Sequence, residues 1–333
     1  MRALLAGLLR FAVWAVPLAP AAAQNPISPP GVYVADPSAR VWDDRLYLYG
    51  STDEACADWC SWHYDVLYTD DLRTWRVTED VFRTRGPNDQ VLYNDVRLFA
   101  PDVARHDGKY YLYYCQPNAD AEGVAVGTSP LGPFRGGTAL DLGEHSEIDP
   151  AVFVDDDGTT YYLWGQFSLK MARLRPDHRG IDPSTLRTDI ITEADHYFHE
   201  GAYLTKRNGV YYLIYADISR EGKPTCLGYA TSDAPFGPYT YRGVIVDNDG
   251  CNPNNWNNHG SIASFGERWY VFYHRSTHGC LTMRKACVEP ITFRADGSIP
   301  EVEMTTQGAA PPLNARDTLA AARACLLQGH GRV

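Results

Sequence analysis

The sequence predicts an all-β protein, a five-bladed β-propeller, from two observations. The first is a strand pattern that occurs five times, in which a turn with Gly or Asp leads into alternating aromatic and aliphatic residues. The copies are "DDRLYLYG", "DGKYYLYY", "DGTTYYLWG", "NGVYYLIY" and "GERWYVFYH", and they place Tyr47, Tyr111, Tyr162, Tyr212 and Tyr270 at intervals of 50 to 64 residues. Repeats of this length built from strand-turn-strand units are typical of propeller blades.

The second observation is that the stretches between these copies carry turn signals rather than helical periodicity. "TDDLRTW", "TSPLGPF" and "TSDAPFGPY" suit the outer hairpins of blades. We therefore expect residues 24–310 to form the propeller. Residues 311–333 are expected to form a tail, where "ARDTLAAARACLL" has the pattern of a short helix with Asp317 as its N-cap.

Residues 1–23 are expected to be a secretory signal peptide. Arg2 and Arg10 precede an apolar run at 11–18, and small residues at 21–23 provide a cleavage site before Gln24. The apolar run is too short to span a membrane. The sequence therefore predicts a secreted or periplasmic protein without a membrane span.

Composition narrows the class of partner. The chain has 333 residues, of which 44% are hydrophobic and 21% charged, so it can bury a substantial core. Its formal net charge of -11 argues against nucleic acid as a partner, because that affinity depends on Lys and Arg neutralising phosphates. We expect a monomer.

The eight cysteines, all after the signal segment, are expected to form disulfides in an exported protein. Cys56 and Cys60 are close enough in sequence for a local bridge within one loop. The remaining pairings stay open, since eight cysteines allow 105 connectivities. Zinc is a poor alternative, because no CxxC pair or HxxxH accompanies them.

One ionisable residue precedes each copy of the repeat at a similar distance. These residues are Asp36 in "VADPS", Asp102 in "FAPDV", Asp149 in "EIDPA", Glu200 in "HEGAY" and His259 in "NNHGS". They fall where the innermost strand of each blade begins, so all five are expected near one mouth of the central channel. The alternative, that each marks an ordinary turn at a strand entry, weakens when five sites share the register.

At these motifs, together with "MRKACVEPITF", the sequence resembles glycoside hydrolase family 43 from about Asn25 to Gly308. That resemblance implies an inverting enzyme acting on arabinose- or xylose-containing polysaccharides. It implies Asp36 as the general base, Glu200 as the general acid and Asp149 as the carboxylate that tunes the acid. Inversion needs one ionised and one protonated carboxyl group on opposite sides of the sugar.

The resemblance also implies a role for His259, which matches an axial histidine that contacts a structural calcium ion in the channel. Calcium prefers oxygen ligands, so a hydrogen-bonding role in the channel is the alternative. No cofactor is expected to be required for the reaction. By the same resemblance Asp102 is structural rather than catalytic.

Five further residues are candidate sugar contacts. Arg284 in "MRKACVEP" resembles the family arginine that reaches sugar hydroxyls, with a surface ion pair as its alternative, and Arg275 in "YHRS" is a second candidate. Phe99 stands where many members have a Trp, which indicates a differently shaped site. Trp164 and Trp256 are candidate stacking surfaces, although core packing is the commoner fate of a Trp.

The expected function is the release of terminal pentose or furanose units as an alpha-L-arabinofuranosidase or beta-xylosidase. The substrate would be arabinan, arabinoxylan, xylan or a galactofuranose-containing glycan. A beta-galactofuranosidase or an endo-arabinanase on the same fold is the alternative, as is a non-catalytic carbohydrate-binding propeller. A retaining, invertase-like fructosidase is disfavoured, because "ADPS" and "EIDP" stand where "NDPN" and "RDP" are expected.

Overall fold

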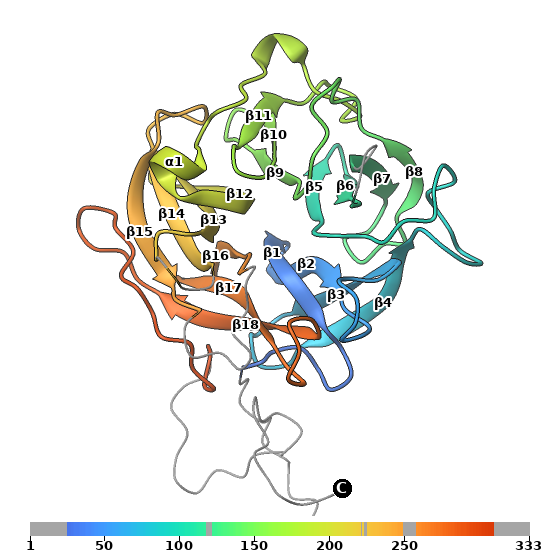
Figure 1. The fold of residues 1–333 in the computed structure, drawn as a ribbon, viewed down its shortest axis with the longest axis horizontal. Helices are drawn as coiled ribbons and strands as arrows, with labels where there is room; N and C mark the ends of the chain where they lie inside the picture. Colours follow the sequence, from blue (N-terminus) through green and yellow to red (C-terminus); the bar gives the residue numbers. More distant parts are fainter. Residues whose placement is uncertain (1–24, 118–121, 221, 223–224, 249–257, 310–333) are drawn as a thin grey trace, which may run out of the picture.

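The computed structural model describes residues 25–117, 122–220, 222, 225–248 and 258–309. The expected signal peptide, the expected C-terminal helix and Trp256 lie outside these ranges. Within them, five antiparallel sheets are arranged around a central axis, so the prediction of a five-bladed β-propeller is confirmed (Figure 1).

Each blade is a meander in which consecutive strands pair with one another. The first blade contains β1 (Val34–Trp42), β2 (Arg45–Thr52), β3 (His63–Thr69) and β4 (Arg76–Arg83), and the second contains β5 (Asp102–His106), β6 (Lys109–Cys115), β7 (Glu122–Gly127) and β8 (Arg135–Ala139). The third contains β9 (Ala151–Val154), β10 (Thr160–Trp164) and β11 (Lys170–Arg173). The fourth contains β12 (Phe198–Arg207), β13 (Val210–Asp217), β14 (Cys226–Ser232) and β15 (Thr240–Val246), and the fifth contains β16 (Ser261–Phe265), β17 (Arg268–Ser276) and β18 (Arg284–Ile291).

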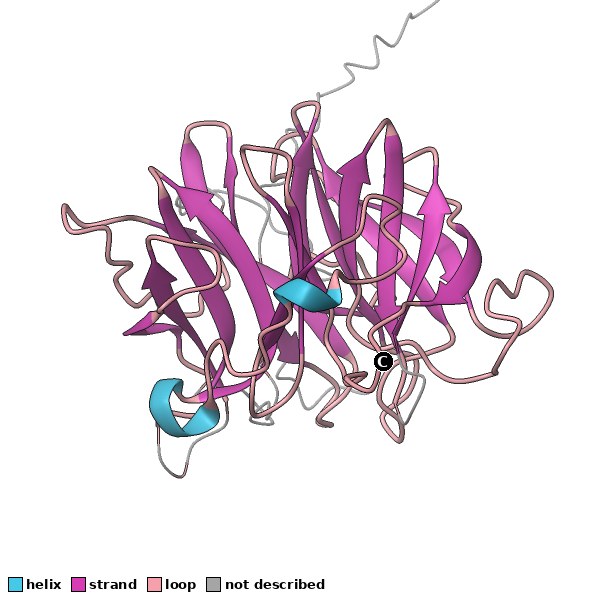
Figure 2. Ribbon diagram, turned by 90° about the horizontal axis from the view of Figure 1, so that it is seen from above, coloured by secondary structure: helices cyan, strands magenta, loops and turns pink. Residues whose placement is uncertain are grey.

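Among the residues that the structure describes, helical structure is limited to two short elements between the third and fourth blades (Figure 2). They are the 3-10 turn η1 (Pro183–Thr185) and the single-turn helix α1 (Glu193–His196). Among the described residues, no helix is long and apolar enough to cross a membrane.

The aromatic residues of the repeat form the packing between blades. Five hydrophobic clusters each combine residues of two neighbouring blades. Tyr47, Tyr162, Tyr212 and Tyr270 lie on the second strands of their blades, each in a different cluster. A blade cannot bury both faces alone, so the repeat specifies the ring as well as the strands.

The N-terminal segment covers the outer edge of the fifth blade. The Ile27 N–H donates to the carbonyl oxygen of Ala286 on β18, and the Asn25 side-chain amide donates to the carbonyl oxygen of Val288. An exposed strand edge is prone to pairing with other chains. Residues 25–28 thus protect β18 and join the start of the chain to its last blade.

At the centre of the ring, Asp102 and Arg40 join the first three blades. The Arg40 guanidinium forms an ion pair with Asp102 and donates to the carbonyl oxygen of Val152, at 2.7 Å. The Asp102 carboxylate also accepts from the Ser38 hydroxyl at 2.6 Å and from the Val152 N–H at 2.8 Å. Asp102 therefore has the structural role that the sequence indicates.

Replacing this carboxylate by an amide should destabilise the whole ring. Asp102→Asn leaves the buried Arg40 guanidinium without its counter-charge, and breaking a buried pair in this way costs about 3–5 kcal/mol. The free energy of unfolding, measured in denaturant, tests this. Asp70→Asn is the matched control, because Asp70 is likewise paired with arginine, through Arg45 and Arg76, but is exposed. Equal losses in the two variants would contradict the central role of Asp102.

Candidate active site

A cavity of about 270 Å³ opens at the mouth of the channel where the innermost strands begin. Asp36 from the first blade, Asp149 at the entry to the third and Glu200 from the fourth all line it. The structure thus brings the three predicted carboxylates into one pocket. Phe99, His259 and Arg284 line it as well.

Irregular backbone turns these carboxylates toward the cavity. Asp36 and Asp149 have left-handed backbones, with φ of 51° and 59°. The β1 strand has a bulge around Asp36, and β12 has two register shifts on either side of Glu200. Bulges re-aim side chains, and non-glycine residues with positive φ are concentrated at functional sites.

Asp36 is surrounded by donors that stabilise its ionised form. Its Oδ1 lies 3.0 Å from Arg284 Nη1, and its Oδ2 accepts from the Ser51 hydroxyl at 2.5 Å. Burial opposes ionisation, but the positive charge of Arg284, the imidazoles of His274 and His259 and the Ser51 hydroxyl together lower the pKa of Asp36. This carboxyl group is therefore ionised at neutral pH.

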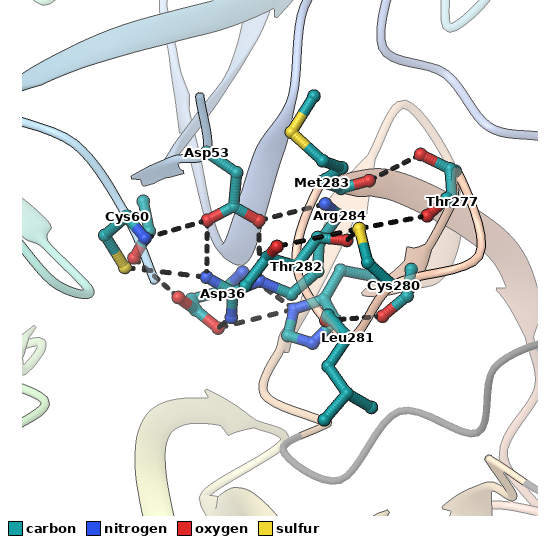
Figure 3. Close-up of polar contacts among 12 residues, drawn as sticks. Asp36, Asp53, Cys60, Thr277, Cys280, Leu281, Thr282, Met283 and Arg284 are labelled. Atoms are coloured by element: carbon teal, nitrogen blue, oxygen red, sulfur yellow. Dashed lines mark hydrogen bonds and ion pairs between the residues drawn. The ribbon is translucent and has the colours of Figure 1, made fainter. Parts of the chain in front are cut away.

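Arg284 is held by two carboxylates from the first blade (Figure 3). It is 1% exposed, and its Nε and Nη2 donate to Asp53 at 2.8 and 2.9 Å while its Nη1 donates to Asp36. A surface ion pair, the alternative weighed from the sequence, is therefore wrong. In this arrangement the Arg284 guanidinium forms an ion pair with the Asp36 carboxylate. Its contact with a sugar hydroxyl remains a prediction.

The environment of Asp149, beside Glu200, disfavours the ionised carboxylate, in contrast to that of Asp36. Burial, followed by the negative charges of Glu200 and Asp36, raises the pKa of Asp149 well above its usual range. Asp149 therefore holds a proton to higher pH than an exposed aspartate does. Gln166 supports the pair, because its amide Nε2 donates to Glu200 Oε2 at 2.7 Å.

His259 lies between the base side and the acid side of the pocket. Its Nδ1 is 3.9 Å from both Asp36 Oδ1 and Asp149 Oδ2, and burial lowers its pKa. The part of the chain that the structure describes contains no group of three His, Cys, Asp or Glu side chains placed to hold a metal. At 3.9 Å neither contact is a hydrogen bond, so the hydrogen-bonding role and the calcium role of His259 both stay predictions.

The remaining predicted sugar contacts separate into three groups. Phe99 lines the cavity, whereas Trp256 lies outside the described residues. Trp164 is fully buried between the second and third blades, where its indole donates to the carbonyl oxygen of His145 at 2.5 Å. Arg275 donates to Cys287 Sγ and to the carbonyl oxygen of Thr305, and it is not among the residues that line the cavity. Trp164 is therefore corrected to a core residue, whereas a sugar contact by Arg275 stays a prediction.

Among the cavity-lining residues that sequence reasoning missed are Trp59, Gln166 and His199. Gln166 follows β10, and His199 directly precedes Glu200, so each lies beside a residue that the sequence did single out. Trp59 belongs to the loop "EACADWCSWHYD", which has no recognisable pattern. Its only signal was the position of that loop at the expected channel mouth.

The structure corrects the predicted pairing of Cys56. Cys56 bonds to Cys280, 224 residues away, and Cys60 is a free, buried thiol. The local bridge between Cys56 and Cys60 is therefore wrong, because Cys60 points into the pocket beside Arg284. Two other described cysteines, Cys115 and Cys287, are also free and buried.

Comparison with known proteins agrees with this geometry. The model of the glycosyl hydrolases family 43 matches residues 23–299. A xylosidase/arabinosidase of Thermoclostridium stercorarium is 33% identical, over 91% of this chain and 72% of the relative. The structure of a GH43_1 enzyme from Xanthomonas citri with xylose has 30% identity and a TM-score of 0.71, covering 85% of this chain and 94% of that one. A beta-xylosidase/alpha-arabinofuranosidase from a compost metagenome, solved with xylotriose in a calcium-free form, has 30% identity and a TM-score of 0.69, covering 84% and 98%.

Gly201 is required where the His259 ring passes over the backbone next to Glu200. Its φ is +67°, and a Cβ there would lie 2.7 Å from His259 Cγ. Gly201→Ala should lower the free energy of unfolding by about 2–4 kcal/mol, from the left-handed backbone and the overpacking together. Gly209→Ala is the control, because its φ is +82° with no atom near the added Cβ. Equal losses on denaturant unfolding would rule out the steric contact with His259.

Proposed function

Because the chain belongs to glycosyl hydrolase family 43 and is a glycoside hydrolase, we propose that it is a secreted, inverting enzyme that releases terminal xylose or arabinofuranose units. One observation carries the mechanism. A single pocket holds one carboxyl group with a lowered pKa, Asp36, and one with a raised pKa, Asp149, with Glu200 beside them. Environments that push carboxyl pKa values apart identify the base and the acid.

Asp36 is the general base in this proposal. Its ionised carboxylate takes a proton from a water molecule, and that water attacks the anomeric carbon from the face opposite the leaving group. The charge of Arg284 keeps Asp36 ionised, and the backbone N–H of Asp36, which donates to His274 Nδ1 at 2.8 Å, fixes its position. Burial lowers the pKa of His274 to about 3, so this imidazole is neutral and accepts that hydrogen bond.

Glu200 is the general acid, and it gives its proton to the glycosidic oxygen as the bond breaks. Asp149, a buried carboxyl group with a raised pKa, lies across His259 from the base and is the residue that tunes the acid in this proposal. After the transfer, Gln166 stabilises the ionised Glu200, since its amide donates to the carboxylate. No step needs a group from outside this chain other than water and the sugar.

The names of the relatives support a terminal pentose as the substrate unit. The relative from Thermoclostridium stercorarium is a xylosidase/arabinosidase, and xylose was bound in the related Xanthomonas citri structure. Xylan, arabinoxylan and arabinan contain such units, and galactofuranose remains the alternative ring. The expected signal peptide and the disulfide between Cys56 and Cys280 support secretion, since disulfides persist in oxidising compartments.

Hydrolysis of a panel of aryl glycosides tests the enzyme and names the ring. The panel holds alpha-L-arabinofuranoside, beta-D-xylopyranoside, beta-D-galactofuranoside and alpha-L-arabinopyranoside. Asp36→Asn should lose activity on every substrate, by at least about 10³-fold, because no other group activates the water. Glu200→Ala should lose far more activity on natural glycosides than on aryl glycosides, because the aryl leaving groups need no proton.

Two results would overturn these roles. Substantial turnover of aryl glycosides by Asp36→Asn would exclude Asp36 as the base, and equal losses on both substrate types would exclude Glu200 as the acid. NMR of the first sugar released reports the stereochemistry. Retained anomeric configuration would refute inversion.

The pH profile of kcat/KM tests the acid pair. Asp36 has a lowered pKa, so the acid limb falls only when the pH drops through that value. The alkaline limb falls when the general acid loses its proton. Asp149→Asn removes the charge that opposes ionisation of Glu200. The alkaline limb should therefore move to lower pH, by about one unit or more.

The control for that shift is Asp156→Asn, a change on the exposed turn after β9 in the same blade. It removes the same charge from the protein surface, where solvent screens it. An alkaline limb that stays in place in Asp149→Asn, or moves equally in both variants, would contradict the tuning role.

A further inference from the structure

Two loops from the first and last blades meet at the rim of the pocket. Residues 53–60 follow β2, and residues 277–283 connect β17 to β18. The disulfide between Cys56 and Cys280 joins their tips, and the Thr282 hydroxyl donates to the carbonyl oxygen of Ala55 at 2.9 Å. Figure 3 shows the second loop beside Asp53 and Arg284, the residues that lie under both loops.

The first loop is anchored at its base as well as at its tip. The Cys60 N–H donates to Asp53 Oδ1 at 3.1 Å, which closes the loop on itself. Arg97 binds the loop from outside, since its Nη1 donates to the carbonyl oxygen of Cys60 and its Nη2 pairs with Asp58, both at 2.8 Å. These contacts fix the backbone on both sides of Trp59.

Trp59 is the residue that this anchoring positions. Its ring lines the cavity together with the three carboxylates, and it is half-buried rather than packed in the core. The Arg284 guanidinium carbon lies 4.8 Å from the centroid of the indole. The same arginine that holds Asp36 ionised therefore holds the indole against the pocket.

We propose that Trp59 is a substrate-contacting residue, against whose indole the sugar ring packs, and that the Cys56–Cys280 disulfide holds it in place. The inference rests on the proposed function, and it adds a sugar-binding residue that the carboxylates cannot replace. A rigid aromatic surface buries the C–H groups of a sugar at a low cost in side-chain entropy. Carboxylates and Arg284 can bind only its hydroxyls.

Substitution of Trp59 tests the contact by separating KM from kcat on the aryl glycoside that wild type turns over best. Trp59→Ala should raise KM roughly tenfold and change kcat less, because a contact made equally in ground and transition states affects binding. Trp59→Phe should recover most of the loss. Trp62→Ala is the matched control, because Trp62 packs against Arg85 and Arg97 and is absent from the cavity lining.

An unchanged KM in Trp59→Ala would overturn the proposal. An equal rise in Trp62→Ala would also overturn it, because the effect would then come from the loop as a whole. A wild type inactive on the entire panel would count against the proposed function instead. In that case the binding of free xylose and arabinose to wild type, Trp59→Ala and Trp62→Ala, measured by calorimetry, tests the same contact without catalysis.

The disulfide is tested on folded protein with dithiothreitol. Cys56 is exposed and Cys280 half-exposed, so the reagent reaches the bond. The two thiols of one dithiothreitol molecule reduce the bond to two cysteine thiols, and the reagent becomes its cyclic disulfide. Reduction should raise KM of wild type several-fold, as should Cys280→Ser, and should add little in Trp59→Ala, because both changes act through one contact.

Circular dichroism before and after reduction shows whether the propeller remains folded. Equal increases in KM on reducing wild type and Trp59→Ala would show that the disulfide acts elsewhere. An unchanged KM in reduced, folded wild type would show that the other anchors of the loop suffice, and it would overturn the role given to the disulfide.

Discussion

The ion pair network of Arg284 with Asp36 and Asp53 is the interaction on which the candidate site depends. Arg284 comes from the last blade and both carboxylates come from the first, so the network exists only when the ring is closed. A buried guanidinium needs partners for its charge and its donors. Two carboxylates supply them, and one of these is thereby kept ionised for catalysis.

Departures from ideal strand geometry make the convergence of charges possible. Ideal strands send alternate side chains to opposite faces of a blade, and a propeller packs both faces against its neighbours. The left-handed residues Asp36 and Asp149 and the bulges of β1 and β12 direct carboxyl groups to the axis instead. Gly201 then leaves the space in which His259 reaches between them.

The features that repeat along the chain could be predicted from the sequence. The aromatic strand motif is local and recurs, so it indicated five blades, and its register placed Asp36, Asp149 and Glu200 at one mouth. Contacts between distant loops could not be predicted, because nothing local encodes them. Cys56 is close to Cys60 in sequence but bonds to Cys280, and Trp59 gains its role only from Arg284. The prediction for Trp164 was wrong because the sequence does not say whether a Trp side chain points into the core or into the pocket.

The contacts that close the ring of blades also build the candidate site. The N-terminal segment pairs with β18, the disulfide joins the first blade to the loop before β18, and Arg284 begins that strand. Three kinds of contact, hydrogen bonds, a covalent bond and buried ion pairs, thus hold one seam. The base lies on one side of that seam, and the arginine that sets its charge lies on the other. Opening the seam would separate Arg284 from Asp36 and remove the positive charge that stabilises the ionised carboxylate. The contacts that close the ring therefore also keep the base ionised.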